Sequence, residues 1–128
     1  MDFVLDSNIF IFAFDPPQKP SCVSLLALLL ENRATFHVHI PRLILTEIRR
    51  NLTPLLMQDA MRFAHQLAIP DEDFVVPSKL SAQYEARGLK PADAFIGAYA
   101  EWVKADGLIS ENRHFLSRPS LPMLRSRR

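Results

Sequence analysis

Glycine, cysteine and long apolar runs are all scarce in this sequence. The 128 residues include only 3 Gly, and Gly88, Gly97 and Gly107 stand far apart. Dinucleotide-binding and Walker loops need clustered glycines where the backbone approaches phosphate, so both kinds of nucleotide cradle are excluded. The single cysteine, Cys22, can form neither an intrachain disulfide nor a Cys-rich zinc site, which favours a reducing compartment.

No segment of the sequence is suited to a membrane or to secretion. The longest apolar run, Leu25 to Leu30, is far shorter than the ~20 residues that span a bilayer. The first residues, Met1 to Asp6, lack the basic start of a secretory signal. We therefore expect a cytoplasmic protein. With 48% hydrophobic and 23% charged residues and no visible linker, the chain is expected to form a single domain over residues 1–128.

The net charge of +1 hides a division along the chain. Residues 1–112 hold 10 basic and all 14 acidic residues, a net charge of −4, whereas residues 113–128 hold five arginines and no acid. We expect a basic C-terminal tail from about residue 117. Such a tail either improves solubility or attracts a polyanion such as RNA, and the sequence leaves both interpretations open.

Apolar periodicity predicts alternating strands and helices. We expect short strands over residues 3–5, 36–40, 74–76 and 108–110, and helices over 21–32, 41–50, 57–68, 80–87 and from 91 onward. This alternation favours a parallel sheet with helices on both faces. The helix at 21–32 is apolar almost all round, which indicates burial on several sides or a partner surface, as does the apolar run at 9–12.

Carboxylates stand at positions where such a sheet binds ligands, beyond the carboxyl ends of its strands. Asp6 follows the first strand and Glu111 follows the strand at 108–110, while Glu47 lies beside the apolar stripe of its helix and Asp93 in a first helical turn. Each has a structural alternative. Asp6 can cap a helix, Glu47 can pair with Arg50, Asp93 can stabilise a helix terminus, and Glu111 can be a solvated loop acid.

Taken together, these acids indicate a cation site. Carboxylates brought close together repel one another unless a divalent cation neutralises them, and oxygen ligands favour Mg²⁺ or Mn²⁺ over zinc. A cluster of this kind suits hydrolysis of phosphodiesters by a metal-activated water. We therefore expect a metal-dependent nuclease.

At these residues the sequence resembles a PIN domain, in particular the VapC type, the ribonuclease toxin of bacterial toxin–antitoxin pairs. The matching segments, in the family's order and spacing, are Val4 to Ile9, Pro41 to Arg50, Pro91 to Ala98 and Leu108 to Phe115. The resemblance implies a three-layer α/β/α fold with a five-stranded parallel sheet in the order 3-2-1-4-5. It also implies an Mg²⁺- or Mn²⁺-dependent endoribonuclease, which would bind an RNA substrate, form a homodimer and pair with a cognate antitoxin.

The resemblance also implies roles for individual residues. The family's first three acidic positions match Asp6, Glu47 and Asp93, and the fourth matches Asn112, which has no charge; Glu111 is the alternative ligand there. Residues at positions that contact the metal ligands or the substrate are Ser7, Ser110 and Arg113. His114 is expected to be a surface histidine, because no complementary acid–base partner is evident.

Two other functions stay open at this level. A catalytically silent RNA-binding or scaffold domain is compatible with Asn112, because an amide holds metal more weakly than a carboxylate. A phospho-receiver module is disfavoured, because Asp6 is followed by Ser7 and Asn8 rather than by a second acid.

Overall fold

The structure is a computed structural model that describes residues 1–68, 76–111 and the backbone of 123 and 124. Its strands are β1 (Asp2–Leu5), β2 (His37–His39), β3 (Gly107–Ile109) and β4 (Met123–Leu124). Its helices are α1 (Ser7–Phe14), α2 (Pro20–Glu31), α3 (Arg42–Asn51), α4 (Pro54–Leu67), α5 (Ser78–Glu85) and α6 (Pro91–Trp102). None of these helices is long and apolar enough to cross a membrane.

The strands form one parallel sheet in the order β2-β1-β3-β4. β1 lies inside the sheet, where Val4 faces His39 of β2 and Leu108 of β3 in register. Val4 and Leu5 are fully buried, as expected for an inner strand covered on both faces. The sheet therefore brings the carboxyl ends of β1 and β3, which lie about a hundred residues apart in sequence, to the same edge.

The predicted fold, a five-stranded sheet in the order 3-2-1-4-5, is corrected by this topology. Four strands pair among the described residues, and β4 is an edge strand that the sequence did not indicate. The strand predicted over 74–76 lies outside the described residues except for Val76, which is buried but not in a strand. Because strand order depends on long-range pairing, the apolar pattern of single segments did not determine it.

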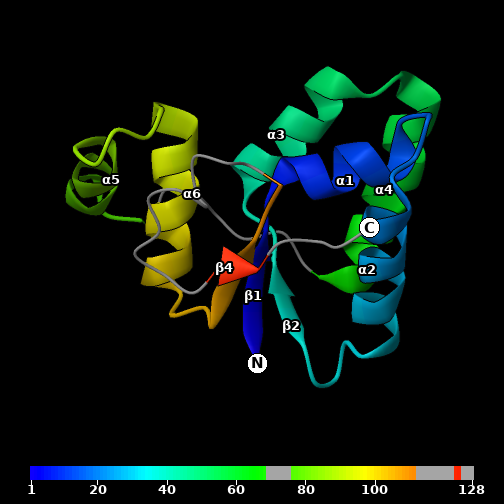
Figure 1. The fold of residues 1–128 in the computed structure, drawn as a ribbon, viewed down its shortest axis with the longest axis horizontal. Helices are drawn as coiled ribbons and strands as arrows, with labels where there is room; N and C mark the ends of the chain where they lie inside the picture. Colours follow the sequence, from blue (N-terminus) through cyan, green and yellow to red (C-terminus); the bar gives the residue numbers. More distant parts are fainter. Residues whose placement is uncertain (69–75, 112–122, 125–128) are drawn as a thin grey trace.

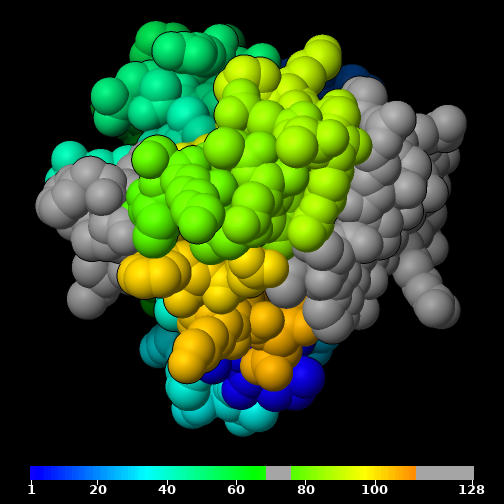
Figure 2. Space-filling model, turned by 90° about the vertical axis from the view of Figure 1, so that its left-hand side faces the viewer, coloured from blue at the N-terminus to red at the C-terminus, as the bar shows by residue number. Residues whose placement is uncertain are grey.

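Helices flank the sheet on two sides (Figure 1). α1, α2, α3 and α4 pack against one another on one side, while α5 and α6 pair on the other. Figure 2 shows the face that α5 and α6 present to solvent. Three helices begin with proline, at Pro20, Pro54 and Pro91, since proline fits the first helical position, where its missing N–H is not needed.

Candidate functional site

Asp6 occupies the junction between β1 and α1 and takes part in four hydrogen bonds, one of them from the Ile9 N–H to its carbonyl oxygen at 3.2 Å. Its backbone N–H donates to the carbonyl oxygen of Ile109 at 3.0 Å. Its Oδ1 accepts from the Ser7 N–H at 2.8 Å, and its Oδ2 accepts from the Ser110 hydroxyl at 2.8 Å. Asp6 therefore caps α1 and also ties that helix to the end of β3. Only 4% of the residue is exposed, so this carboxylate is a fixed and buried group.

Burial raises the pKa of the Asp6 carboxyl, and the negative charge of Asp93 raises it further. The hydrogen bonds from Ser110 and Ser7 act in the opposite direction, because they stabilise the ionised form. Asp93 approaches from the first turn of α6, on the other side of the sheet from α1. The fold thus brings carboxylates from separate elements within electrostatic reach of one another.

Glu47 is the third member of this carboxylate cluster, which we define as Asp6, Glu47 and Asp93. The pKa of Glu47 is raised first by burial and then by the charges of Asp6 and Asp93. A hydrogen bond from the Ser7 side chain and the positive charge of Arg50 oppose this shift. Ser7 therefore touches two of the carboxylates. The arrangement concentrates negative charge where β1 ends.

The fit of a metal ion to this cluster follows from its donor atoms. Both Asp6 carboxylate oxygens already accept hydrogen bonds from protein groups. Across the described ranges, no group of three or more His, Cys, Asp or Glu side chains is placed so that it could hold a metal ion. Binding of Mg²⁺ or Mn²⁺ by these residues therefore stays a prediction.

Glu111, the predicted alternative ligand, has a cation as its neighbour. Its Oε2 lies 2.8 Å from Nζ of Lys19, and its side chain is 5% exposed. Its backbone N–H donates to Oδ1 of Asn8 at 3.1 Å. Lys19 and Asn8 were not predicted as partners of Glu111, because nothing in their spacing indicates a contact some ninety or more residues away. The predicted roles of Asn112 and Arg113 lie outside the described residues.

A second feature is an apolar groove of about 180 Å³ on the helices α1, α2 and α4. It is lined by Ala13, Phe14, Val23, Leu26, Ala27 and Phe63. The rings of Phe14 and Phe63 meet edge to face with their centroids 6.1 Å apart. Phe12, Val23 and Leu28 are large apolar residues of α1 and α2 that remain 43%, 44% and 51% exposed.

The apolar character of α1 and α2 therefore has two origins. Ile9 and Phe10, in the apolar run at 9–12, are fully buried. These two residues therefore belong to the core and not to a contact surface. The exposed apolar residues of the groove do not belong to the core. Removing their apolar surface from water would stabilise the protein by roughly 25 cal/mol per Å², and the isolated chain does not gain this stabilisation. An apolar surface left open in this way is typical of a protein-binding site.

The raised pKa of Glu47 leads to a prediction for the pH dependence of folding. The pKa of Glu47 is higher in the folded state than in the unfolded chain. Ionisation of Glu47 therefore destabilises the fold once the pH rises above the ordinary pKa of a glutamate. We expect Glu47→Gln to increase the free energy of unfolding at pH 7 by up to about 1 kcal/mol, since solvent screens a half-exposed charge. At pH 4 the carboxyl is mostly protonated, and the gain should largely disappear.

Urea unfolding at both pH values measures this difference. Asp59→Asn is the matched control, because Asp59 is an exposed carboxylate of α4 that pairs only weakly with Arg62 at 3.8 Å. It should change stability by less than about 0.5 kcal/mol at either pH. A Glu47→Gln protein that is less stable than wild type at pH 7 contradicts the assignment of repulsion to this cluster.

Comparison with known proteins finds solved structures that share this fold. No family model matches the chain, and no curated protein matches it. The solved structure of VapBC2 from Rickettsia felis, bound to a DNA fragment from its promoter, contains a chain with 20% identity and a TM-score of 0.72, over 99% of this chain and 100% of that one.

Two further structures are similar over nearly the full length. FitAcB from Neisseria gonorrhoeae contains a chain with 17% identity and a TM-score of 0.67, over 95% of this chain and 96% of that one. FitAB bound to the IR36 DNA fragment contains a chain with 18% identity and a TM-score of 0.69, over 96% and 94%. At these identities the likeness establishes a shared fold.

These findings correct the prediction of a PIN-domain, VapC-type ribonuclease. No family model supports that membership, and the similar structures are described as VapBC2 and FitAB complexes, two of them on DNA and none on RNA. The assignment as a metal-dependent endoribonuclease, its classification as an enzyme and its RNA substrate are therefore withdrawn. The physical reason is that strand-end carboxylates are common to parallel sheets of many functions, so their spacing does not determine a reaction.

Proposed function

We propose that this chain is one subunit of a two-protein toxin–antitoxin complex that binds DNA. Its similarity to chains of VapBC2 and FitAB extends over at least 95% of its length, so the proposal concerns the whole described fold rather than one motif. DNA binding by two of those complexes supports the same function here. The cognate partner predicted from the sequence remains part of this proposal.

The observation that carries the proposal is the apolar groove on α1, α2 and α4. Its described lining residues are all apolar, and Val23 among them is 44% exposed although α2 buries other apolar residues. We assign the groove to a helical segment of the partner that presents aliphatic and aromatic side chains at helical spacing. Helix-in-groove contacts of this kind derive their affinity from desolvated apolar anchors.

Copurification tests the proposal. We would express the chain with the protein encoded by the adjacent reading frame, tag only that protein, and measure the recovered stoichiometry and mass by light scattering. The purified complex would then be titrated with a labelled duplex from the upstream region of the two genes. We expect a stable complex that binds this duplex more tightly than a scrambled one. Separate elution of the two proteins, or a complex with no preference for its own upstream DNA, would refute the proposal.

Finer predictions belong to the same proposal. A homodimer of this chain within the complex would appear as twice its mass in the light-scattering measurement. A cytoplasmic location is the natural one for a complex that binds DNA. Neither follows from the fold alone, and both are checked on the assembled complex.

A further inference from the structure

A basic groove lies between α3 and α4 and is separate from both features described above. It has a volume of about 450 Å³ and is lined by Arg42, Leu45, Thr46, Arg49, Met61 and His65. None of these described lining residues is acidic. The groove therefore combines arginine and histidine side chains with two apolar ones, and its field favours an anionic ligand.

The two arginines are spaced to reach neighbouring anionic groups. Arg42 and Arg49 lie seven residues apart on α3, which places them on one helix face about 10 Å apart along the axis. Both residues are exposed. Thr46, between them, donates its hydroxyl hydrogen to the Arg42 carbonyl oxygen at 3.1 Å. Each guanidinium carries several N–H donors, so the pair can contact two separate phosphate oxygens.

His65 completes the groove from α4. Its Nδ1 lies 2.9 Å from the carbonyl oxygen of Met61, and because a carbonyl only accepts, the hydrogen sits on Nδ1. The Nε2 atom is left as the second polar atom of the ring. The side chains of Leu45 and Met61 provide apolar surface beside these groups. Along a nucleic-acid backbone, these apolar side chains could contact sugar carbons while the polar groups contact phosphate oxygens.

The apolar groove and the basic groove lie on opposite faces of α4. Phe63 lines the apolar groove, whereas Met61 and His65 line the basic one. Two residues along an α-helix correspond to a rotation of about 200°. A partner helix seated on the Phe63 face therefore leaves the His65 face free for a second ligand.

We propose that the basic groove between α3 and α4 contacts the sugar–phosphate backbone of the DNA to which the complex binds. This inference rests on the proposed function and adds that this chain touches the DNA directly. Contacts of this kind position a protein on DNA without reading its sequence, and they make the affinity depend on salt.

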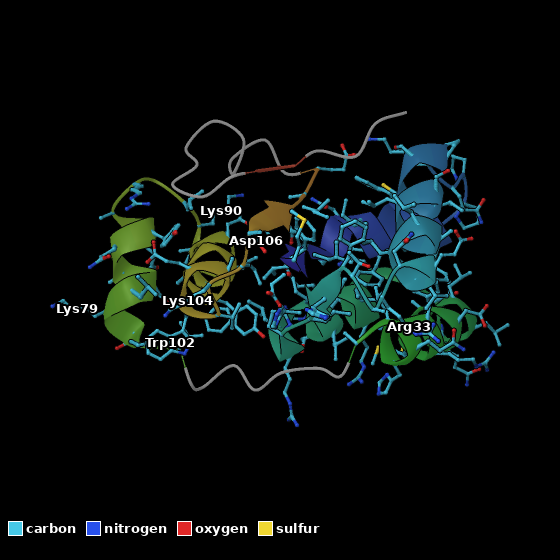
Figure 3. All side chains as sticks on the ribbon, turned by 90° about the horizontal axis from the view of Figure 1, so that it is seen from below. Arg33, Lys79, Lys90, Trp102, Lys104 and Asp106 are labelled. Atoms are coloured by element: carbon cyan, nitrogen blue, oxygen red, sulfur yellow. The ribbon has the colours of Figure 1, made fainter. Side chains whose placement is uncertain are left out.

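The test compares charge-matched variants of the complex. Arg42→Gln/Arg49→Gln removes two positive charges from the groove. Lys79→Gln/Lys90→Gln removes two from exposed residues on the α5 and α6 side of the molecule, away from α4 (Figure 3). Fluorescence anisotropy would measure the affinity of each complex for the upstream duplex at several salt concentrations.

We expect the arginine variant to bind the duplex about tenfold more weakly at ~100 mM salt, equally for specific and scrambled sequences. The slope of log affinity against log salt should fall in magnitude by about 1.8, or 0.9 for each phosphate contact. The lysine variant should match wild type in both quantities.

Three results overturn the inference, and they differ from one another. Equal affinity and slope for the arginine variant and wild type would show that the groove does not touch DNA. Loss of the partner from the arginine variant would assign the groove to an acidic segment of that partner. A wild-type complex that binds no DNA would refute the proposed function itself, and the inference with it.

Discussion

Val23→Asp/Ala27→Asp is expected to weaken binding of the partner protein by at least about a hundredfold. Both residues line the apolar groove on α2, one helical turn apart on the same face. A partner side chain that fills the groove would bury the two new carboxylates without a counterion, and burying an unpaired polar or charged group costs several kcal/mol. A hundredfold change corresponds to about 2.7 kcal/mol.

The free protein should tolerate this double substitution. Both residues are exposed in the isolated chain, so the carboxylates stay in water there and the fold loses little packing. Isothermal titration calorimetry with the partner would measure affinity, and circular dichroism would confirm folding. Leu55→Asp is the matched control, because Leu55 is 76% exposed on α4 and does not line the groove. An equal loss of affinity in both variants would show that the groove is not part of the interface.

Gly97→Ala is expected to destabilise the protein by up to about 2 kcal/mol, although alanine is the better helix former. A Cβ atom at Gly97 would lie 2.8 Å from both Cδ1 and Cε1 of Tyr84, closer than carbon atoms approach. Overpacking in a core costs about 1–3 kcal/mol. Replacing glycine by alanine inside a helix gains about 1 kcal/mol of stability. This gain offsets only part of an overpacking cost at the upper end of that range.

The Tyr84 ring has little freedom to withdraw from this contact. It is 2% exposed, its hydroxyl donates to Oε1 of Glu101 at 3.3 Å, and the Arg87 guanidinium lies over its face at 4.7 Å. An added methyl group therefore pushes α5 away from α6. The melting temperature should fall by roughly 5–10 °C in a calorimetric scan.

A double-mutant cycle separates the clash from other effects of Gly97→Ala. In a Tyr84→Leu background the obstructing ring is absent, so Gly97→Ala should there be neutral or stabilising. If the alanine destabilises both backgrounds equally, the contact between Gly97 and Tyr84 is not the cause.

The secondary structure was largely predictable because its causes are local. The predicted helix over 41–50 forms as α3, Arg42–Asn51, and the one begun by Pro91 forms as α6. The apolar triplet at 3–5 lies within β1. Proline at a first helical position and a regular apolar spacing act over one or two turns, and these signals can be read from neighbouring residues.

The candidate site was only partly predictable. The positions of Asp6, Glu47 and Asp93 near strand and helix ends follow from the segment pattern, and the structure brings these three groups within electrostatic reach. The ion pair of Lys19 with Glu111 did not follow. It joins groups that are distant in sequence, which only the tertiary fold brings together.

The function suggested by short motifs proved to be the least secure part of the sequence analysis. Segments around Asp6, Glu47 and Asp93 resembled a ribonuclease family, whereas the comparisons lead to DNA-bound two-protein complexes. A parallel sheet places polar residues at its strand ends for many purposes, so such spacing by itself is weak evidence for one reaction.

By itself, the sequence determined what the chain lacks and where its helices begin. Its three glycines are too scattered for the glycine-rich phosphate-binding motifs, and none of the described helices is long and apolar enough to cross a membrane. Only the tertiary structure decided the strand order, the apolar groove on α1, α2 and α4, and the basic groove between α3 and α4. The reason is physical: local sterics set helix ends, whereas a groove exists only when elements distant in sequence pack side by side.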